Sequence, residues 1–257
     1  MTQSSSPDGT DAFAAADLSD LLPEGGTFEA SIPLGIDGAG LSLACIPGSG
    51  RELPDAVRAW VEADPHADGE PAVWMTFQGA HLHWSPGRAA ILAPGERLDS
   101  VRAVVVEATA HARELRTIER TMTAWWPELE ADSALAFEFE ESAVPRRRQL
   151  RARLHRAMVL RARLARIAPY LLSPLVHPPT LASQVADRMR ERLRMSARHE
   201  AASLQIEVFR DTYETCGARA SEFMLARTGH RLEWAIIVLL GAQLLLWGFE
   251  YLSMAAG

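Results

Sequence analysis

A nearly unbroken apolar stretch, residues 232–254 (LEWAIIVLLGAQLLLWGFEYLSM), most constrains what this chain can fold into. Between Glu233 and Glu250, Gln243 is the only strongly polar residue. As a helix rising about 1.5 Å per residue, this apolar core is roughly 24 Å long, close to the ~30 Å hydrocarbon layer of a bilayer. We therefore predict a single transmembrane anchor over residues 231–254. The competing interpretation is a buried helix in the core of a soluble protein.

The residues flanking this segment predict how it lies in a bilayer. Aromatic side chains favour the two interfaces, and basic residues precede the segment whereas none follows it. The positive-inside tendency then leaves the N-terminal bulk in the cytoplasm, as in a single-pass protein of a bacterial inner membrane. Two glycines seven residues apart, with a glutamine nearby, form a face that either packs against another helix or is featureless. The predicted anchor and interface residues are Arg231, Glu233, Trp234, Gly241, Gln243, Trp247, Gly248 and Tyr251.

Charge and composition divide the chain into two halves. All 26 basic residues are Arg, which is typical of a GC-rich bacterial genome. Residues 1–145 carry 8 Arg and 24 acidic residues, whereas residues 146–257 carry 18 Arg and 9 acidic residues. Cys45 and Cys216 are too far apart in sequence for a metal or redox motif, which fits a reducing compartment. The first residues lack the basic start and apolar run of a secretory signal.

We predict an α+β protein with four regions. Residues 1–26 form a flexible acidic tail, and residues 27–145 form a small cytoplasmic domain in which helices pack on one antiparallel sheet. Residues 146–230 form an Arg-rich helical hairpin or stalk, which precedes the anchor. The predicted strands of the domain are 27–33, 40–47, 72–84 with a turn at Gly79, 88–93 and 135–139, and its predicted helices are 53–63 and 99–124, the second capped by Asp99.

The stalk is predicted from two helical patterns separated by four prolines. A basic helix covers residues 146–167, and a second helix runs from Leu181 almost to Gly229, with Gly217 and Gly229 as its weak points. We expect the basic helix to fold back antiparallel on the longer one.

Three stretches resemble a known family. Residues 231–240 (RLEWAIIVLL), where a long helix meets an apolar run, are similar to the end of the required-for-meiotic-nuclear-division family, a family of bacterial and mitochondrial proteins whose domain has no known function. Residues 77–84 (FQGAHLHW) resemble its early strand, and residues 108–115 (ATAHAREL) resemble the helix that follows. The chain departs from the family pattern at 177–179 (HPP) and in having no Asn. The resemblance implies a membrane-anchored protein, and it brings no catalytic motif or cofactor.

One pattern of side chains could bind a metal. His81 and His83 alternate on a predicted strand and therefore point to one face. Glu107 and His111, four residues apart on the next helix, could complete a zinc or iron site. The alternative is that the two histidines are polar residues on the solvated face of an edge strand. We otherwise find no phosphate-binding loop and no serine-hydrolase elbow, and we predict neither a cofactor nor a catalytic residue.

The basic helix is the strongest functional candidate in the sequence. Its arginines could contact anionic lipid headgroups, RNA phosphates, or acidic residues of this chain or a partner, and a merely solvated helix is the fourth alternative. No aromatic residues interleave the arginines, which disfavours single-stranded RNA. The predicted basic surface comprises Arg146, Arg147, Arg148, Arg151, Arg156, Arg163 and Arg166.

From these features we predict a non-enzymatic, membrane-anchored scaffold or adaptor. It would self-assemble as a homo-oligomer or act as an accessory subunit of a larger membrane complex. A module that tethers RNA or ribosomes to the membrane is the first alternative. A metal-dependent enzyme using His81, His83 and His111 is the second.

Overall fold

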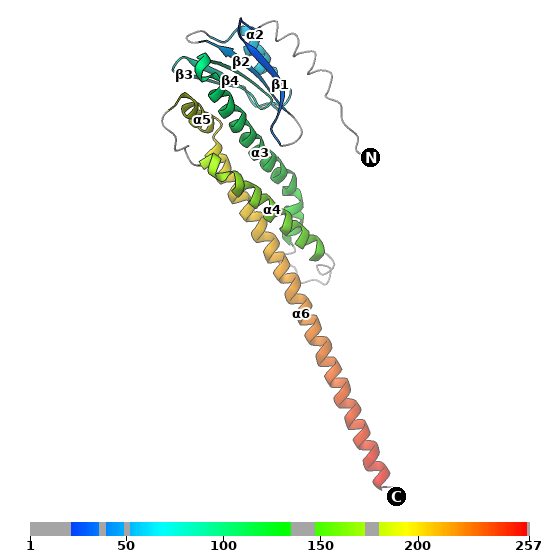
Figure 1. The fold of residues 1–257 in the computed structure, drawn as a ribbon. Coiled ribbons are helices and arrows are strands. Elements are labelled where there is room, and N and C mark those ends of the chain that lie inside the picture. The colour runs from blue at the N-terminus through cyan, green and yellow to red at the C-terminus, as the bar shows by residue number, and fades with distance from the viewer. Residues whose placement is uncertain (1–21, 36–39, 49–51, 135–146, 173–179, 256–257) are drawn as a thin grey trace, which may run out of the picture. The chain divides into compact units, whose positions relative to one another are not determined.

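The structure is a computed structural model that describes residues 22–35, 40–48, 52–134, 147–172 and 180–255 (Figure 1). The chain forms two compact units. Unit 1 comprises residues 1–121 and 162–203, and unit 2 comprises residues 122–161 and 204–257. The sequence suggested a division at residue 145, whereas three long helices each contribute residues to both units. The predicted acidic tail lies outside the described residues up to position 21, as does the predicted strand 135–139.

Unit 1 is built on a five-stranded sheet. Its strand order is β1 (Thr27–Pro33), β2 (Gly40–Pro47), β5 (Arg88–Ala93), β4 (Ala80–Trp84) and β3 (Val73–Phe77). The described strands thus lie where the sequence pattern placed them, and the α+β class is confirmed.

The expectation of a wholly antiparallel sheet is wrong for one pair of strands. β2 and β5 are parallel, with Ser42 opposite Arg88 and Pro47 opposite Ala93, whereas the other three pairs are antiparallel. A parallel pair needs a long crossover connection, which here contains the helix α2 (Asp55–Glu62) and the β3–β4 hairpin. The sheet is therefore mixed.

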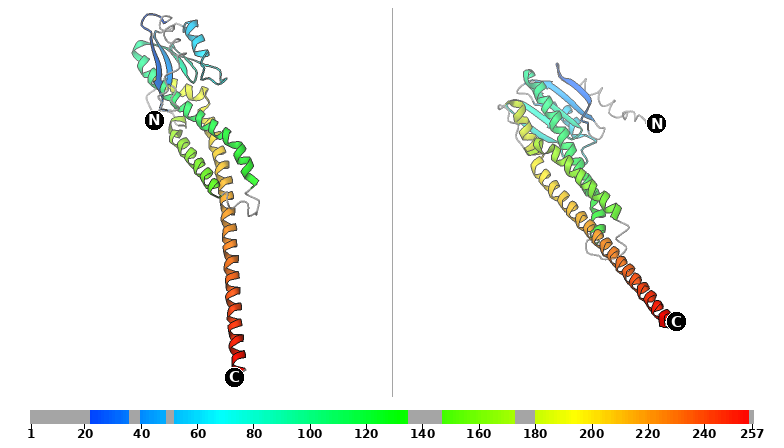
Figure 2. Two further views of the ribbon diagram at one scale, coloured as in Figure 1. Left: turned by 90° about the vertical axis from the view of Figure 1, so that its right-hand side faces the viewer. Right: turned by 60° about the horizontal axis from the view of Figure 1, so that its bottom comes forward.

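Helices cover both faces of this sheet (Figures 1 and 2). α2 buries Val57 and Val61 against Ala44, Ala90 and Leu92, which share one face. The first part of α3 (Gly95–Ser133) covers the opposite face, where the indole Nε1 of Trp84 donates to Thr109 Oγ1 at 2.8 Å. The helix α5 (Leu181–Arg192) packs beside β3 through a buried face that includes Val185 and Met189.

Two of the predicted helices have different boundaries in the structure. α3 begins at Gly95, so Asp99 is not its N-cap, and it continues through Pro127 to Ser133. The long helix is interrupted after α5, where Arg194 adopts a left-handed conformation with φ 51°. Gly217 and Gly229, the expected weak points, lie inside the continuous helix α6 (Met195–Ala255).

Unit 2 has a helical core of its own. The basic helix α4 (Arg147–Leu172) contributes Leu150 and Ala157, α6 contributes Phe209, Tyr213 and Cys216, and the end of α3 contributes Leu129. The predicted pairing of the basic helix with the long helix is therefore part of a three-helix arrangement. The sequence had assigned the end of α3 to the preceding domain.

Candidate functional site

The last part of α6 is a helix that is long enough and apolar enough to cross a membrane. The candidate span covers 20 residues, Thr228–Trp247, and none of it is buried. Val238 and Leu244 are 64% and 73% exposed, so the part of the chain that the structure describes does not cover them. The alternative of a buried core helix is therefore wrong for this segment, and a bilayer is the solvent that suits it.

The predicted anchor residues are found on this helix. The exposed members of this set are Arg231, Glu233, Trp234, Gly241, Gln243 and Trp247. Gly248 and Tyr251 also lie on α6, and their burial lies outside the description. At the start of the span, the indole Nε1 of Trp234 donates to His230 Nε2 at 3.1 Å. An indole beside polar side chains at the end of an apolar helix suits a membrane interface.

The same helix carries core residues of unit 2. Phe209 and Tyr213, 1% and 3% exposed, lie on α6 ahead of the span, and the helix has no break between them and Trp247. The apolar segment is thus a direct continuation of an element that is packed into the folded protein, rather than a tail joined by a flexible linker.

The basic helix α4 is partly neutralised by acidic residues of the chain itself. Arg156 Nη2 lies 3.0 Å from Glu128 Oε2, and Arg163 Nε lies 2.9 Å from Glu114 Oε1. Arg166 is 3.7 Å from the same Glu114 carboxylate, whose side chain is only 3% exposed. Three of the seven predicted residues therefore form ion pairs within their own unit.

The structure shows no ion pair for those of the other four predicted arginines whose side chains it describes. Arg148 and Arg151 are exposed and have no ion-pair partner among the described residues. Arg146 lies outside the described residues, as does the side chain of Arg147. The basic surface that α4 presents to solvent is thus smaller than the sequence suggested.

The four candidate metal ligands are not brought together. His81 and His83 lie on the sheet face covered by α2, and His83 Nε2 is 3.8 Å from Glu62 Oε1 of that helix. Glu107 and His111 lie on α3, against the opposite face, where the His111 ring stacks on Tyr170 with centroids 4.3 Å apart. Within the described ranges, no group of three or more His, Cys, Asp or Glu side chains could hold a metal ion.

Burial lowers the pKa of two of the candidate metal ligands, His83 and His111. Desolvation lowers the pKa of His83, partly opposed by Glu62, and Arg58 lowers that pKa further. Desolvation also lowers the pKa of His111, while Glu107 raises it. Both imidazoles are therefore favoured in their neutral form.

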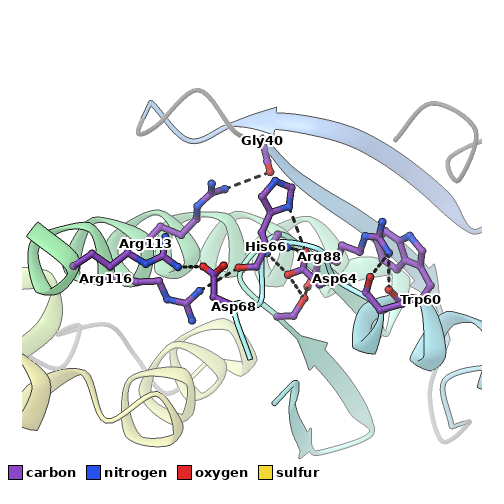
Figure 3. A network of polar contacts seen from close by, with 12 residues as sticks. Gly40, Trp60, Asp64, His66, Asp68, Arg88, Arg113 and Arg116 are labelled. Atoms are coloured by element: carbon purple, nitrogen blue, oxygen red, sulfur yellow. Dashed lines mark hydrogen bonds and ion pairs between the residues drawn. The ribbon is translucent and has the colours of Figure 1, made fainter. Parts of the chain in front are cut away.

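A buried carboxylate organises the loop between α2 and β3 (Figure 3). The side chain of Asp64 is completely buried. It accepts hydrogen bonds from the Gly87 amide at 2.7 Å, from Ser85 Oγ at 2.8 Å and from the His66 amide at 2.9 Å. Gly87 is required here, since a Cβ atom at that position would lie 2.6 Å from Asp64 Oδ1.

Arginines of α3 complete this network. Arg113 donates to the Gly40 carbonyl at 3.3 Å, and Arg116 donates to the His66 carbonyl at 3.3 Å (Figure 3). Arg116 also pairs with Glu70, and Arg120 pairs with Asp68. The three arginines and Asp68 line a hollow of about 250 Å³. An anion entering this hollow would have to displace Asp68 or Glu70, so the network holds the loop against α3 rather than forming an open site.

A second cationic surface lies along β3, at the edge of the sheet. A hollow of about 520 Å³ is lined by residues 74–77 of this strand, by Gln78 and by Arg188 and Arg192 of α5. A neighbouring hollow of about 510 Å³ shares Arg192 and adds Arg194 and Arg198. This surface was not identified from the sequence. The spacing of Arg188 and Arg192 by one helical turn was a visible signal, although it could not show which strand they accompany.

No protein-family model, curated protein or solved structure matches this chain. The resemblance to the required-for-meiotic-nuclear-division family stays a prediction from the three stretches of sequence described above.

Proposed function

We propose that this protein is a non-enzymatic, membrane-anchored adaptor or scaffold, which self-assembles or serves as an accessory subunit of a membrane complex. The observation that carries the proposal is the continuity of α6, which contains both buried core residues and an entirely exposed apolar span. A helix of this kind couples a folded module to a bilayer without a flexible joint.

The orientation follows from charge. Arg231 lies near the N-terminal end of the candidate span and residues 232–257 contain no basic residue, so the folded units would lie in the cytoplasm, at the inner membrane of a bacterial cell. The cationic surfaces of such a protein would then face cytoplasmic partners and the anionic leaflet.

The ion pairs of α4 favour an architectural role for most of its arginines. Glu114 and Glu128 bind three of the predicted arginines, and these contacts join α4 to α3 inside each unit. Phosphates of RNA would have to compete with these carboxylates. Protein partners are therefore favoured over RNA.

The proposal is tested by isolating the full chain from membranes in a mild detergent and measuring its mass by light scattering. We expect a defined oligomer, or a fixed set of co-purifying membrane proteins that remains after cross-linking in intact cells. A clean monomer without partners in both measurements would contradict the scaffold role.

A matched pair of variants tests the anchor separately. Leu239→Arg and Leu244→Arg together place two charges in the apolar span, at about 2.5–3.5 kcal/mol each near the centre of a bilayer. We expect much of the protein to move from the carbonate-resistant membrane fraction to the soluble fraction. Leu239→Ala with Leu244→Ala should leave it in the membrane.

A further inference from the structure

We infer that the free edge of β3 binds an extended, acidic segment of a partner protein by adding it as a further strand to the sheet. The inference rests on the proposed adaptor function and names the site and chemistry of one partner. All the residues involved belong to unit 1.

The hairpin geometry shows which backbone groups of β3 are available. β3 and β4 are joined by two residues, Gln78 and Gly79, with φ 36° and 81°, as in a type I′ turn. In such a hairpin, Phe77 and Ala80 form a hydrogen-bonded pair, and hydrogen-bonded and non-hydrogen-bonded pairs then alternate along the register. Trp74 and Thr76 occupy non-hydrogen-bonded positions, so their N–H and C=O groups point away from β4.

No described strand pairs with this outer side of β3, which ends the strand order of the sheet. The opposite edge is blunted, because β1 has an irregular register around Ser31, at φ 53°, and ends in Pro33. Within β3 itself, neither a bulge nor a proline interrupts the edge. A regular edge with open backbone groups is a template for strand addition.

Charge determines which peptide fits. Arg188 and Arg192 line the hollow beside β3, one turn apart on α5. Arg188 lies 2.8 Å from the exposed Glu191 of its own helix, whereas Arg192 and Arg194 have no ion-pair partner among the described residues. The two acidic residues of the adjoining hollow are engaged, Glu70 by Arg116 and Glu119 by Arg198. The surface therefore has unbalanced positive charge.

The positive charge beside β3 and the alternation of side chains along a strand together predict the sequence pattern of the peptide. Alternate side chains of an added strand point to opposite faces of the sheet. Those on the α5 side would meet Arg188 and Arg192, and those on the other side would meet Trp74. The preferred segment thus has Asp or Glu at every second position, with β-branched or aromatic residues between them and no proline.

The test measures binding of fluorescent peptides to the full chain in detergent micelles by anisotropy. The probe is a short, end-blocked peptide that alternates Glu with Val, and its control alternates Lys with Val. We expect saturable binding of the Glu peptide only. Arg188→Glu with Arg192→Glu should weaken it about tenfold or more. The control variant, Arg97→Glu with Arg161→Glu, makes the same change of charge at exposed positions outside this surface and should bind normally.

N-methylation distinguishes strand addition from simple charge attraction. One derivative carries N-methyl groups on the Glu residues and the other carries them on the Val residues. Because the acidic residues must face α5, only one set of amides can pair with β3, so we expect one derivative to lose binding and the other to keep it. Thr76→Pro, which removes an outward donor, should also weaken binding, provided that its thermal melt matches that of the parent protein.

Three results would overturn the inference: no saturable binding up to about 1 mM peptide, equal binding of the Glu and Lys peptides, or equal binding of the two N-methyl derivatives. An oligonucleotide of uridines that binds with the same dependence on Arg188 and Arg192 would overturn it in favour of nucleic acid. If these results occur while the chain still purifies as an oligomer or with partners, the adaptor function stands and only the β3 site is wrong.

Discussion

The Asp64 network allows one substitution to be predicted in depth. Asp64→Asn keeps the shape of the side chain but removes its charge and exchanges one acceptor oxygen for a donor. If the amide oxygen of the new Asn faces Ser85 and Gly87, it still accepts their two hydrogen bonds, but now as an uncharged acceptor. The hydrogen bond from the His66 amide is lost. Hydrogen bonds to a charged group contribute about 1.5–3 kcal/mol and neutral ones about 0.5–1.5 kcal/mol. Weakening two of the bonds therefore costs about 2–3 kcal/mol and losing the third costs about 1.5–3 kcal/mol, so the free energy of unfolding should fall by about 3.5–6 kcal/mol.

Because the chain has two compact units, this loss is best measured with a reporter inside unit 1. Cys45 is 2% exposed and lies on β2, so its alkylation in increasing urea follows the opening of the sheet. We expect the midpoint of Cys45 labelling to move to lower urea in Asp64→Asn, and hydrogen exchange at the Gly87 amide to accelerate.

Asp55→Asn is the matched control, since it makes the same chemical change on α2. The Asp55 side chain is 89% exposed, and its ion-pair partner among the described residues is Arg58, one helical turn away, so the midpoint should hardly move. If Asp64→Asn shifts the midpoint no more than Asp55→Asn does, the buried carboxylate does not organise the loop and the argument fails.

Three further predictions concern the core and its titratable groups. Phe209→Ala should lower the free energy of unfolding of unit 2 by about 3–5 kcal/mol, because the ring is 1% exposed and packs on Trp126 at 5.1 Å. The neighbouring Val208→Ala, at a side chain 47% exposed, should cost far less in the same urea titration. The pKa of His83 is lowered in the folded protein, so the unfolded chain binds the proton more readily. The contribution of neutral His83 to stability is therefore present above the unfolded pKa of about 6.5. It is lost as the pH falls through the lower pKa of the folded protein. His83→Gln should therefore flatten the loss of stability on acidification. Burial raises the pKa of Cys45 to about 12, and iodoacetamide at mildly alkaline pH should label this thiol only after urea unfolds unit 1. Rapid labelling of the native protein would contradict the placement of β2 in the core.

The strand pattern shows how far local sequence leads. Val73–Phe77, Ala80–Trp84 and Arg88–Ala93 were all predictable, because alternation and Gly79 are local signals. The parallel pairing of β2 with β5 was not predictable, since parallel and antiparallel pairing are both compatible with the same alternation of side chains. Only the crossover through α2 decides between them.

The histidines show the same limit at a candidate site. His81 and His83 share a face because residues two apart on a strand always do. That face lies under α2, whereas Glu107 and His111 lie on α3 against the other face, and no spacing in the sequence reports which helix covers which side.

The sequence by itself determined the apolar span, the positions of the described strands and the charge difference between the two halves. These properties depend on composition and on periods of two or a few residues. The tertiary structure alone decided where the charges act. It placed Glu114 and Glu128 against the α4 arginines, and it placed Arg188 and Arg192 beside the open edge of β3. Such pairings join residues distant along the chain, and their energies depend on distance and burial, which no local pattern contains.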